Sequence, residues 1–181
     1  MKLNKLIAIA TISLLSGGIS MAQKALNLED IVAGNIIQTK GIGSMTWLKD
    51  GERYSRLENN KQTGGTDIVA YQAKDNSREV IIPSSLLTDK STGKPIPVRS
   101  ISWSADNEKV LIYNNTQRVW RYDTRGDYWV LNLKDGALRQ LGKGMPESSM
   151  MFAKFSPDGT RVAYVSNNNI YVEDIDSGKI T

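Results

Sequence analysis

The chain has 181 residues, with 23 Lys and Arg against 19 Asp and Glu, so its formal net charge is +4 at neutral pH. Charges of both signs are interspersed along it, which is typical of a solvated surface and excludes a protein that binds nucleic acid or another polyanion through a basic face. It contains no cysteine and no histidine. No disulfide can therefore form, and we expect no metal centre and no other cofactor.

The first 22 residues have the organisation of a secretory signal peptide. Two lysines open the chain, residues 6–15 are an almost unbroken apolar run, and Ser20-Met21-Ala22 offers small residues at the two positions that signal peptidase reads. The apolar run is well short of the roughly 20 residues that a membrane-spanning helix needs, and a buried N-terminal helix is the weaker alternative. We predict cleavage between Ala22 and Gln23, and export of the mature protein to the periplasm or outside the cell. Loss of the two lysines reduces the net charge from +4 to +2.

Residues 23–43 are predicted to form a lead-in with a short helix. Asn27 is placed to cap residues 28–32, whose acidic residues come early, where the helix dipole favours negative charge. Gly34 offers a stop. The segment is too short to be a domain of its own.

A turn motif repeats three times in the rest of the chain, residues 44–181. An aromatic residue is followed three positions later by Asp and then by Gly or Asn, in copies that begin at Trp47, Trp103 and Phe155, with offsets of 56 and 52 residues. In the last copy, Ser-Pro-Asp-Gly, proline presets the first corner, aspartate bonds its own backbone and glycine accepts the left-handed conformation. Repeats of about 20 to 50 residues indicate solenoids or propellers.

Four short strands are predicted in each of three units, which is the plan of a propeller blade. The runs are rich in β-branched and aromatic residues and are bounded by Gly, Asn, Asp or Ser. We therefore predict an all-β fold of antiparallel four-stranded blades, about three of them, in residues 44–181. The predicted strands are 44–48, 53–57, 67–72 and 79–82, then 99–104, 109–113, 128–133 and 137–141, then 150–156, 161–165, 170–174 and 179–181.

Two segments interrupt this pattern. Residues 84–97 are rich in Ser, Thr, Lys and Pro and are predicted to cross from the first blade to the second. Residues 114–127 separate two strands of the second blade by about twice the length that a hairpin turn prefers, which predicts a long loop. Long loops on a rigid β scaffold often carry binding residues. The alternative is a solvated, positively charged loop with Trp120 folded back onto the blade.

Two stretches of the chain, QRVWRYDTRGDYWVLNLKDG and FAKFSPDGTRVAYVSNNNIYVEDIDSGKIT, closely resemble the N-terminal β-propeller of the dipeptidyl peptidase IV family of serine exopeptidases. The order of the parts is similar as well, from the LNLEDIVAGN helix through the MTWLKDGERY blade and the Trp-Arg loop to the Ser-Pro-Asp-Gly blade. The Trp-Arg loop is the more specific part, because many exported propellers share the Ser-Pro-Asp-Gly turn. The resemblance covers essentially the whole mature chain.

This resemblance implies a propeller of eight blades that caps an α/β-hydrolase domain, with a Ser, Asp, His triad in the second domain and a cavity between the two. Family members remove dipeptides from peptides with free N-termini, with a preference for Pro or Ala in second place, and the full-length protein is a candidate homodimer. The family arginine that holds the substrate backbone corresponds to Arg121. Arg118, Arg125 and Trp120 are the alternative candidates for substrate binding. The family glutamates that bind the substrate amine belong to a segment beyond the third blade, and this chain ends before it.

The chain has no Gly-x-Ser-x-Gly elbow and no histidine, so it lacks the nucleophile setting and the base of a hydrolase. We therefore expect a truncated gene product or sequence fragment of an exported dipeptidyl peptidase, which supplies the substrate gate and is inactive alone. The alternative is a non-catalytic exported propeller, similar to the Tol-system propeller protein, that binds another protein or a glycan on its rim. Further blades and a Gly-x-Ser-x-Gly segment encoded after Thr181 would favour the first hypothesis.

Overall fold

The computed structural model describes residues 28, 32, 41 and 43–181 of the chain. The predicted signal peptide and its cleavage site at Ala22-Gln23 lie outside the described residues, as does most of the short helix predicted after Asn27. Residues from 43 onward belong to one compact unit. The part of the chain that the structure describes holds no helix of the length and apolar character that a membrane span requires. Because the predicted signal peptide lies outside the described residues, export of the protein stays a prediction.

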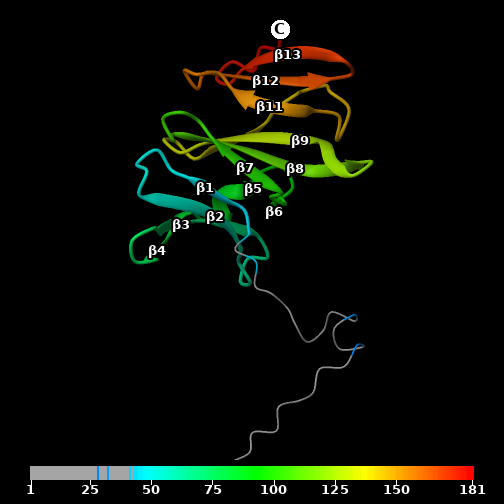
Figure 1. The fold of residues 1–181 in the computed structure, drawn as a ribbon. Coiled ribbons are helices and arrows are strands. Elements are labelled where there is room, and N and C mark those ends of the chain that lie inside the picture. The colour runs from blue at the N-terminus through cyan, green and yellow to red at the C-terminus, as the bar shows by residue number, and fades with distance from the viewer. Residues whose placement is uncertain (1–27, 29–31, 33–40, 42) are drawn as a thin grey trace, which may run out of the picture. The chain divides into compact units, whose positions relative to one another are not determined.

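Within residues 43–181, most strands form three layers, which Figure 1 shows stacked in chain order. Each layer is an antiparallel meander, since strands that follow one another in the chain are neighbours in the sheet. The first two layers have four strands and the third has three. This confirms the predicted all-β fold of four-stranded antiparallel blades. The layers consist of β1 (Met45–Trp47), β2 (Arg53–Asn59), β3 (Thr66–Gln72) and β4 (Arg78–Ile82); β7 (Ser100–Trp103), β8 (Lys109–Val119), β9 (Tyr122–Asn132) and β10 (Ala137–Gln140); and β11 (Met151–Phe155), β12 (Arg161–Ser166) and β13 (Asn169–Asp174).

The third layer differs from the prediction at its outer edge. Residues 179–181, predicted as a fourth strand, pair with β13 through an isolated bridge between Glu173 and Ile180. Two backbone hydrogen bonds of 2.9 Å also join Val172 and Thr181. The segment therefore lies where a fourth strand belongs, but it pairs over too few residues to form one.

The crossing from the first layer to the second contains regular structure of its own. A 3₁₀ helix, η1 (Ser84–Leu87), is followed by a small antiparallel hairpin of β5 (Thr88–Asp89) and β6 (Lys94–Pro95). Leu87 and Ile96 are buried and belong to the apolar cluster between the two layers. The crossing therefore closes one side of the core as well as joining the blades.

The three repeated turns have the same backbone conformation. The residues after the aspartates, Gly51, Asn107 and Gly159, have φ angles of 71°, 59° and 68°, and their amides donate hydrogen bonds of 2.9 to 3.1 Å to the carbonyl three residues earlier. Each aspartate accepts a hydrogen bond of 2.9 to 3.0 Å from the backbone N–H two residues later. Glycine and asparagine tolerate a positive φ better than other residues, so local chemistry explains the repeated motif.

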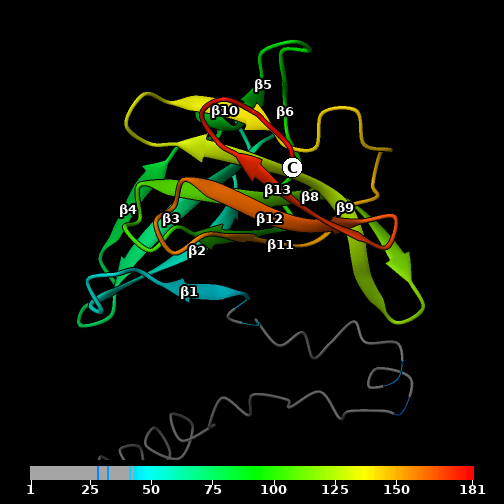
Figure 2. The same cartoon turned by 90° about the horizontal axis from the view of Figure 1, so that it is seen from above.

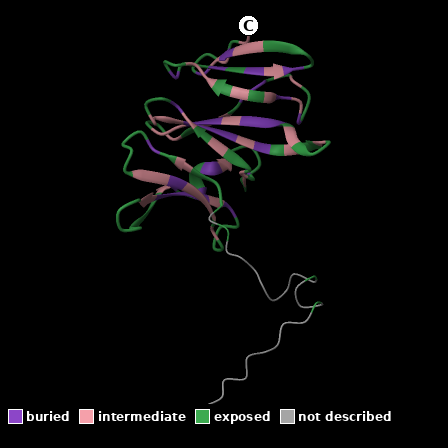
Figure 3. Cartoon of the chain, viewed as in Figure 1, coloured by how far each residue is buried: buried purple, intermediate pink, exposed green. Residues whose placement is uncertain are grey.

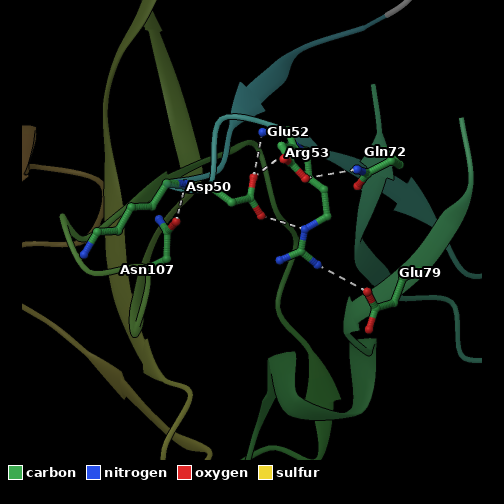
Figure 4. Close-up of polar contacts among 7 residues, drawn as sticks. Asp50, Glu52, Arg53, Gln72, Glu79 and Asn107 are labelled. Atoms are coloured by element: carbon green, nitrogen blue, oxygen red, sulfur yellow. Dashed lines mark hydrogen bonds and ion pairs between the residues drawn. The ribbon is translucent and has the colours of Figure 1, made fainter. Parts of the chain in front are cut away.

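The repeated turns also connect the layers. In the first turn, shown in Figure 4, Asp50 accepts hydrogen bonds from the backbone N–H and the Nε of Arg53, at 3.0 and 2.7 Å. The backbone N–H of Lys49 donates to Oδ1 of Asn107 in the second turn, at 2.6 Å. A Cβ added to Gly159 would lie 3.6 Å from a side chain of the second turn, so the third turn lies against it. The three turns therefore lie side by side at one end of the layers.

Two apolar clusters hold the layers together. Side chains alternate along β8, so Val110 and Ile112 belong to the cluster with the first layer, while Leu111 belongs to the cluster with the third. Figure 3 shows the buried residues concentrated in the strands of the adjoining layers. The cluster between the first and second layers contains Ile68, Ile82, Leu87, Ile96, Val110, Ile112 and Leu131, and the cluster between the second and third contains Leu111, Tyr128, Val130, Leu141, Met150, Val162, Tyr164 and Ile175.

Candidate functional site

The prediction that residues 114–127 form a long loop is wrong, because they form the outer half of a hairpin. β8 and β9 continue to pair from Asn114↔Asp127 to Val119↔Tyr122, and a two-residue turn joins them. The hairpin therefore reaches beyond the rest of its sheet (Figures 1 and 2). Pairing with each other satisfies the backbone groups of the two strands, which is why this polar segment is regular rather than irregular.

Trp120 and Arg121 form the turn at the end of this hairpin. Trp120 has a φ of 62°, which a bulky side chain rarely adopts and which two-residue hairpin turns require at their first central position. Its side chain is 93% exposed. The alternative prediction, in which Trp120 folds back onto the blade, is therefore wrong.

The base of the outer hairpin is tied to the segment that precedes β11. Asn115 Nδ2 donates to a carboxylate oxygen of Asp127 and to one of Glu147, both at 2.7 Å. The other Asp127 oxygen accepts from the backbone N–H of Ser148 at 2.8 Å. Gly126 exchanges two backbone hydrogen bonds with the residue before β11, and a Cβ at this position would clash with a tyrosine ring on β8. The base of the hairpin is thus fixed by polar contacts and by close backbone approach.

A hollow of about 560 Å³ lies beside the end of the hairpin, and we call it the tip hollow. It is lined by residues from the start of the first layer, from the beginning of β7 and from both hairpin strands. Three of the lining residues are arginines and one is an aspartate, so the lining carries a net positive charge. The lining residues are Ser44, Arg99, Ser100, Tyr113, Arg118, Arg121, Tyr122 and Asp123.

The four residues proposed from the sequence are placed differently around the tip hollow. Arg121 and Arg118 both line it, and both are exposed. Arg125 is exposed on the same hairpin but does not belong to the lining, and neither does Trp120. Among the described residues, neither Arg118 nor Arg121 has an ion-pair partner. Two guanidinium groups are therefore available to a ligand in the hollow.

Three other residues of the lining were not found by sequence reasoning. Asp123 forms an ion pair with Arg99, with its Oδ2 atom 3.1 Å from Nη2 and 3.2 Å from Nε. The hydroxyl of Tyr113 donates to the backbone carbonyl of Asp123 at 3.1 Å. Burial, followed by the charges of neighbouring groups, raises the pKa of Tyr113 to about 12, so the hydroxyl stays protonated as a donor. Recognition of a two-residue turn at Trp120 would have placed Asp123 opposite Arg118. Arg99, however, comes from the segment just before β7, which the turn does not locate.

The chemistry of the tip hollow is that of binding. Guanidinium groups donate planar, charge-assisted hydrogen bonds to carboxylates and carbonyls, and the tyrosine and serine hydroxyls add neutral donors and acceptors. Among the side chains that the structure describes, no group of three or more acidic residues is arranged to hold a metal ion. The arrangement suits a peptide backbone or another ligand with oxygen acceptors.

Comparison with known proteins gives a consistent result. Residues 104–181, which include the hairpin, match the model of the dipeptidyl peptidase IV (DPP IV) N-terminal region. The chain is 25% identical to a probable dipeptidyl-aminopeptidase B of Aspergillus terreus over 91% of its own length and 19% of that protein. It is 28% identical to dipeptidyl aminopeptidase B of Saccharomyces cerevisiae over 78% of its length and 17% of that protein. The chain thus spans about a fifth of the length of these relatives.

The fold is also similar to a solved structure. The crystal structure of Porphyromonas gingivalis dipeptidyl peptidase 4 matches 88% of this chain with a TM-score of 0.66, at 21% identity and over 22% of that protein. At this identity the match shows a shared fold, and it agrees with the family model and with the relatives. The family model, the relatives and the shared fold thus agree, and they support a similarity of this chain to the N-terminal β-propeller region of the dipeptidyl peptidase IV family.

Proposed function

We propose that this chain is the propeller part of an exported dipeptidyl peptidase IV-like serine exopeptidase, in which it gates and binds the peptide while a separate α/β-hydrolase domain performs the chemistry. The relatives named dipeptidyl aminopeptidases support this class of enzyme, because they match most of the chain. The signal-peptide pattern of residues 1–22 supports export. The partners are then the hydrolase domain and peptides with free N-termini, and the full-length protein is a candidate homodimer.

The observation that carries the proposal is the pair of arginines in the tip hollow. Arg121 lies in a hairpin turn that reaches beyond its sheet, and Arg118 lines the same hollow. Hydrogen bonds from a charged donor contribute about 1.5–3 kcal/mol. We assign Arg121 to an acceptor oxygen of the substrate backbone and Arg118 to a second donor position beside it.

In this function the chain binds and orients, and bond cleavage takes place on the other domain. A peptide held by two guanidinium groups loses the freedom to slide along the tip hollow, so its reactive bond is presented in one register. Positioning of this kind lowers the barrier for a reaction whose catalytic groups lie elsewhere. Lysine is a poor substitute for either arginine, because a point charge lacks the planar fork.

Substitution of Arg121 in the protein that carries both this chain and a hydrolase domain tests the proposal. We expect Arg121→Ala to lower kcat/KM for dipeptide release about ten- to a hundredfold, which at about 1.4 kcal/mol per factor of ten agrees with the loss of one charge-assisted bond. The melting temperature should stay within about 2 °C of the wild type, because the side chain is exposed.

Arg125→Ala is the matched control, because Arg125 has the same charge on the same hairpin but does not line the tip hollow. Its kcat/KM should stay within about twofold of the wild type. Equal effects of the two substitutions would mean that the net charge of the hairpin matters and the tip hollow does not. A protein that releases no dipeptides at all would exclude the enzyme class.

A further inference from the structure

The outer half of the β8–β9 hairpin has little support from its own sheet. β7 pairs with β8 only as far as Tyr113, so beyond this residue β8 pairs with β9 alone. The register shifts twice in this outer half, on either side of Gln117. An isolated two-stranded ribbon is at best marginally stable, and bulges bend and twist it. The direction of the hairpin end therefore depends on side-chain contacts.

One set of such contacts lies close to Arg121. Asp123 follows Arg121 by two residues, and it is held on both its side chain and its backbone. Arg99, just before β7, binds the carboxylate, while Tyr113 donates to the carbonyl. The ring of Tyr113 is itself stacked on Tyr128 with 4.7 Å between the ring centroids, so the hydroxyl is presented from a packed support. The contacts at the base of the hairpin, by contrast, lie at Asn115 and Asp127, further from the turn.

The ion pair contributes little to the stability of the whole fold. The side chain of Arg99 is 63% exposed and that of Asp123 is 28% exposed. Exposed ion pairs contribute about 1 kcal/mol or less, because solvent screens them. Their loss should leave the blade folded and change only the position of the hairpin end, which has few other contacts.

From this geometry we propose that Arg99 and Tyr113 are positioning residues, which hold Asp123 and thereby fix where Arg121 presents its guanidinium group. The inference rests on the proposed function of Arg121 and names two residues through which that function is maintained. The two nitrogens of Arg99 that lie near Asp123, Nε and Nη2, both contact the same oxygen, Oδ2. A single ammonium group can replace such a contact, so lysine should substitute for Arg99 although it cannot substitute for Arg121.

A double-mutant cycle on kcat/KM for dipeptide release tests the proposal in the protein with its hydrolase domain. We expect Arg99→Ala to lower kcat/KM about five- to twentyfold, chiefly through KM, and Arg99→Lys to recover most of the loss. Because Arg99 acts through Arg121, the variant with both substitutions should be no worse than Arg121→Ala alone. The positioning role would be overturned if the losses of kcat/KM from the two substitutions multiply in the double variant. It would also be overturned if Arg99→Ala leaves kcat/KM unchanged while Arg121→Ala lowers it. A silent Arg121→Ala would overturn the proposed function and this inference together.

Hydrogen–deuterium exchange gives a readout that does not depend on activity. In Arg99→Ala and, to a smaller extent, in Tyr113→Phe, amides of residues 115–126 should exchange at least threefold faster, while those of 128–132 stay unchanged. Lys134→Ala is the matched control, since Lys134 forms an exposed 2.7 Å ion pair with Glu108 in the same layer, away from the tip hollow. Unchanged exchange at 115–126 in Arg99→Ala, or an equal change in the control, would refute the inference.

Discussion

The buried carboxylate of Glu173 joins the second and third layers and gives a sharp test of how the blades are held together. Its side chain is 2% exposed on β13. It accepts hydrogen bonds from the backbone N–H of Gly142 at 2.8 Å, from the Tyr164 hydroxyl at 3.1 Å and from Nη2 of Arg139 at 3.3 Å. Arg139 lies on β10 and Gly142 follows it, so one carboxylate binds donors from both layers. Burial raises the pKa of Tyr164, which keeps its hydroxyl protonated as a donor.

Glu173→Ala should lower the free energy of unfolding by about 3–5 kcal/mol, the usual cost of removing one partner from a buried charged network. The N–H of Gly142 and the hydroxyl of Tyr164 each lose their acceptor, and a buried polar group without a partner costs about 1–3 kcal/mol. Arg139 adds less, because its side chain is 34% exposed and water can replace the contact. Glu173→Gln keeps one acceptor oxygen, so we expect a smaller cost of about 1–2 kcal/mol.

Urea unfolding followed by tryptophan fluorescence measures these differences, with a thermal melt as the second measurement. Glu108→Ala is the matched control, because Glu108 forms an ion pair with Lys134 at 2.7 Å but its side chain is 39% exposed. We expect this control to lie within about 0.5 kcal/mol of the wild type. If Glu173→Ala costs less than about 1 kcal/mol, or no more than the control, the carboxylate does not join the layers as described.

Two further predictions concern the turns. Trp120→Gly should leave the free energy of unfolding unchanged or raise it by about 1 kcal/mol, because glycine relieves a left-handed strain of about 1–2 kcal/mol while the exposed ring buries little. Denaturant unfolding of this variant beside Trp120→Ala measures the change. A decrease in the free energy of unfolding of more than about 1 kcal/mol would contradict the prediction. Acid should destabilise the protein between about pH 4 and pH 2, because hydrogen bonds from Ser104 and Ser156 hydroxyls, and then from backbone N–H groups, lower the pKa of Asp106 and Asp158 to about 2. A depressed carboxyl pKa gives stability that is present above the unfolded pKa and lost as pH falls through the folded one. Melting temperatures at stepped pH should therefore fall in this window and fall less in Asp106→Asn and Asp158→Asn variants, whereas a constant melting temperature would exclude the effect.

The strands and the repeated turns could be predicted from the sequence because their causes are local. Gly51, Asn107 and Gly159 each follow an aspartate and adopt the positive φ that this pattern indicates. The apolar run of Val110, Leu111 and Ile112 lies within the predicted strand 109–113, and the structure places these residues in two different clusters. Short-range chemistry of this kind needs no knowledge of which strands become neighbours.

The outer hairpin was missed because the sequence lacks both signals that predict one. Its strands do not alternate between apolar and polar residues, since much of the ribbon is exposed. Its turn carries Trp120-Arg121 in place of the Asn-Gly or Gly-containing pairs that favour two-residue turns. The contact of Arg99 with Asp123 was beyond prediction for another reason, because it depends on the position of β7 beside the hairpin.

The polar sequence of residues 114–127, which prevented the prediction of a hairpin, is what a two-stranded ribbon that projects from its sheet requires. A ribbon that leaves its blade exposes both faces, so an apolar face would create an exposed patch prone to association. Continued pairing satisfies the backbone without a core, but it leaves the direction of the end undetermined. Polar side-chain contacts, rather than an apolar core, set that direction, at Asn115 and Asp127 near the base and at Asp123 near the turn. Under the proposed function, a hairpin held in this way presents Arg121 at the tip hollow in one position, which a flexible loop of the same length would not do.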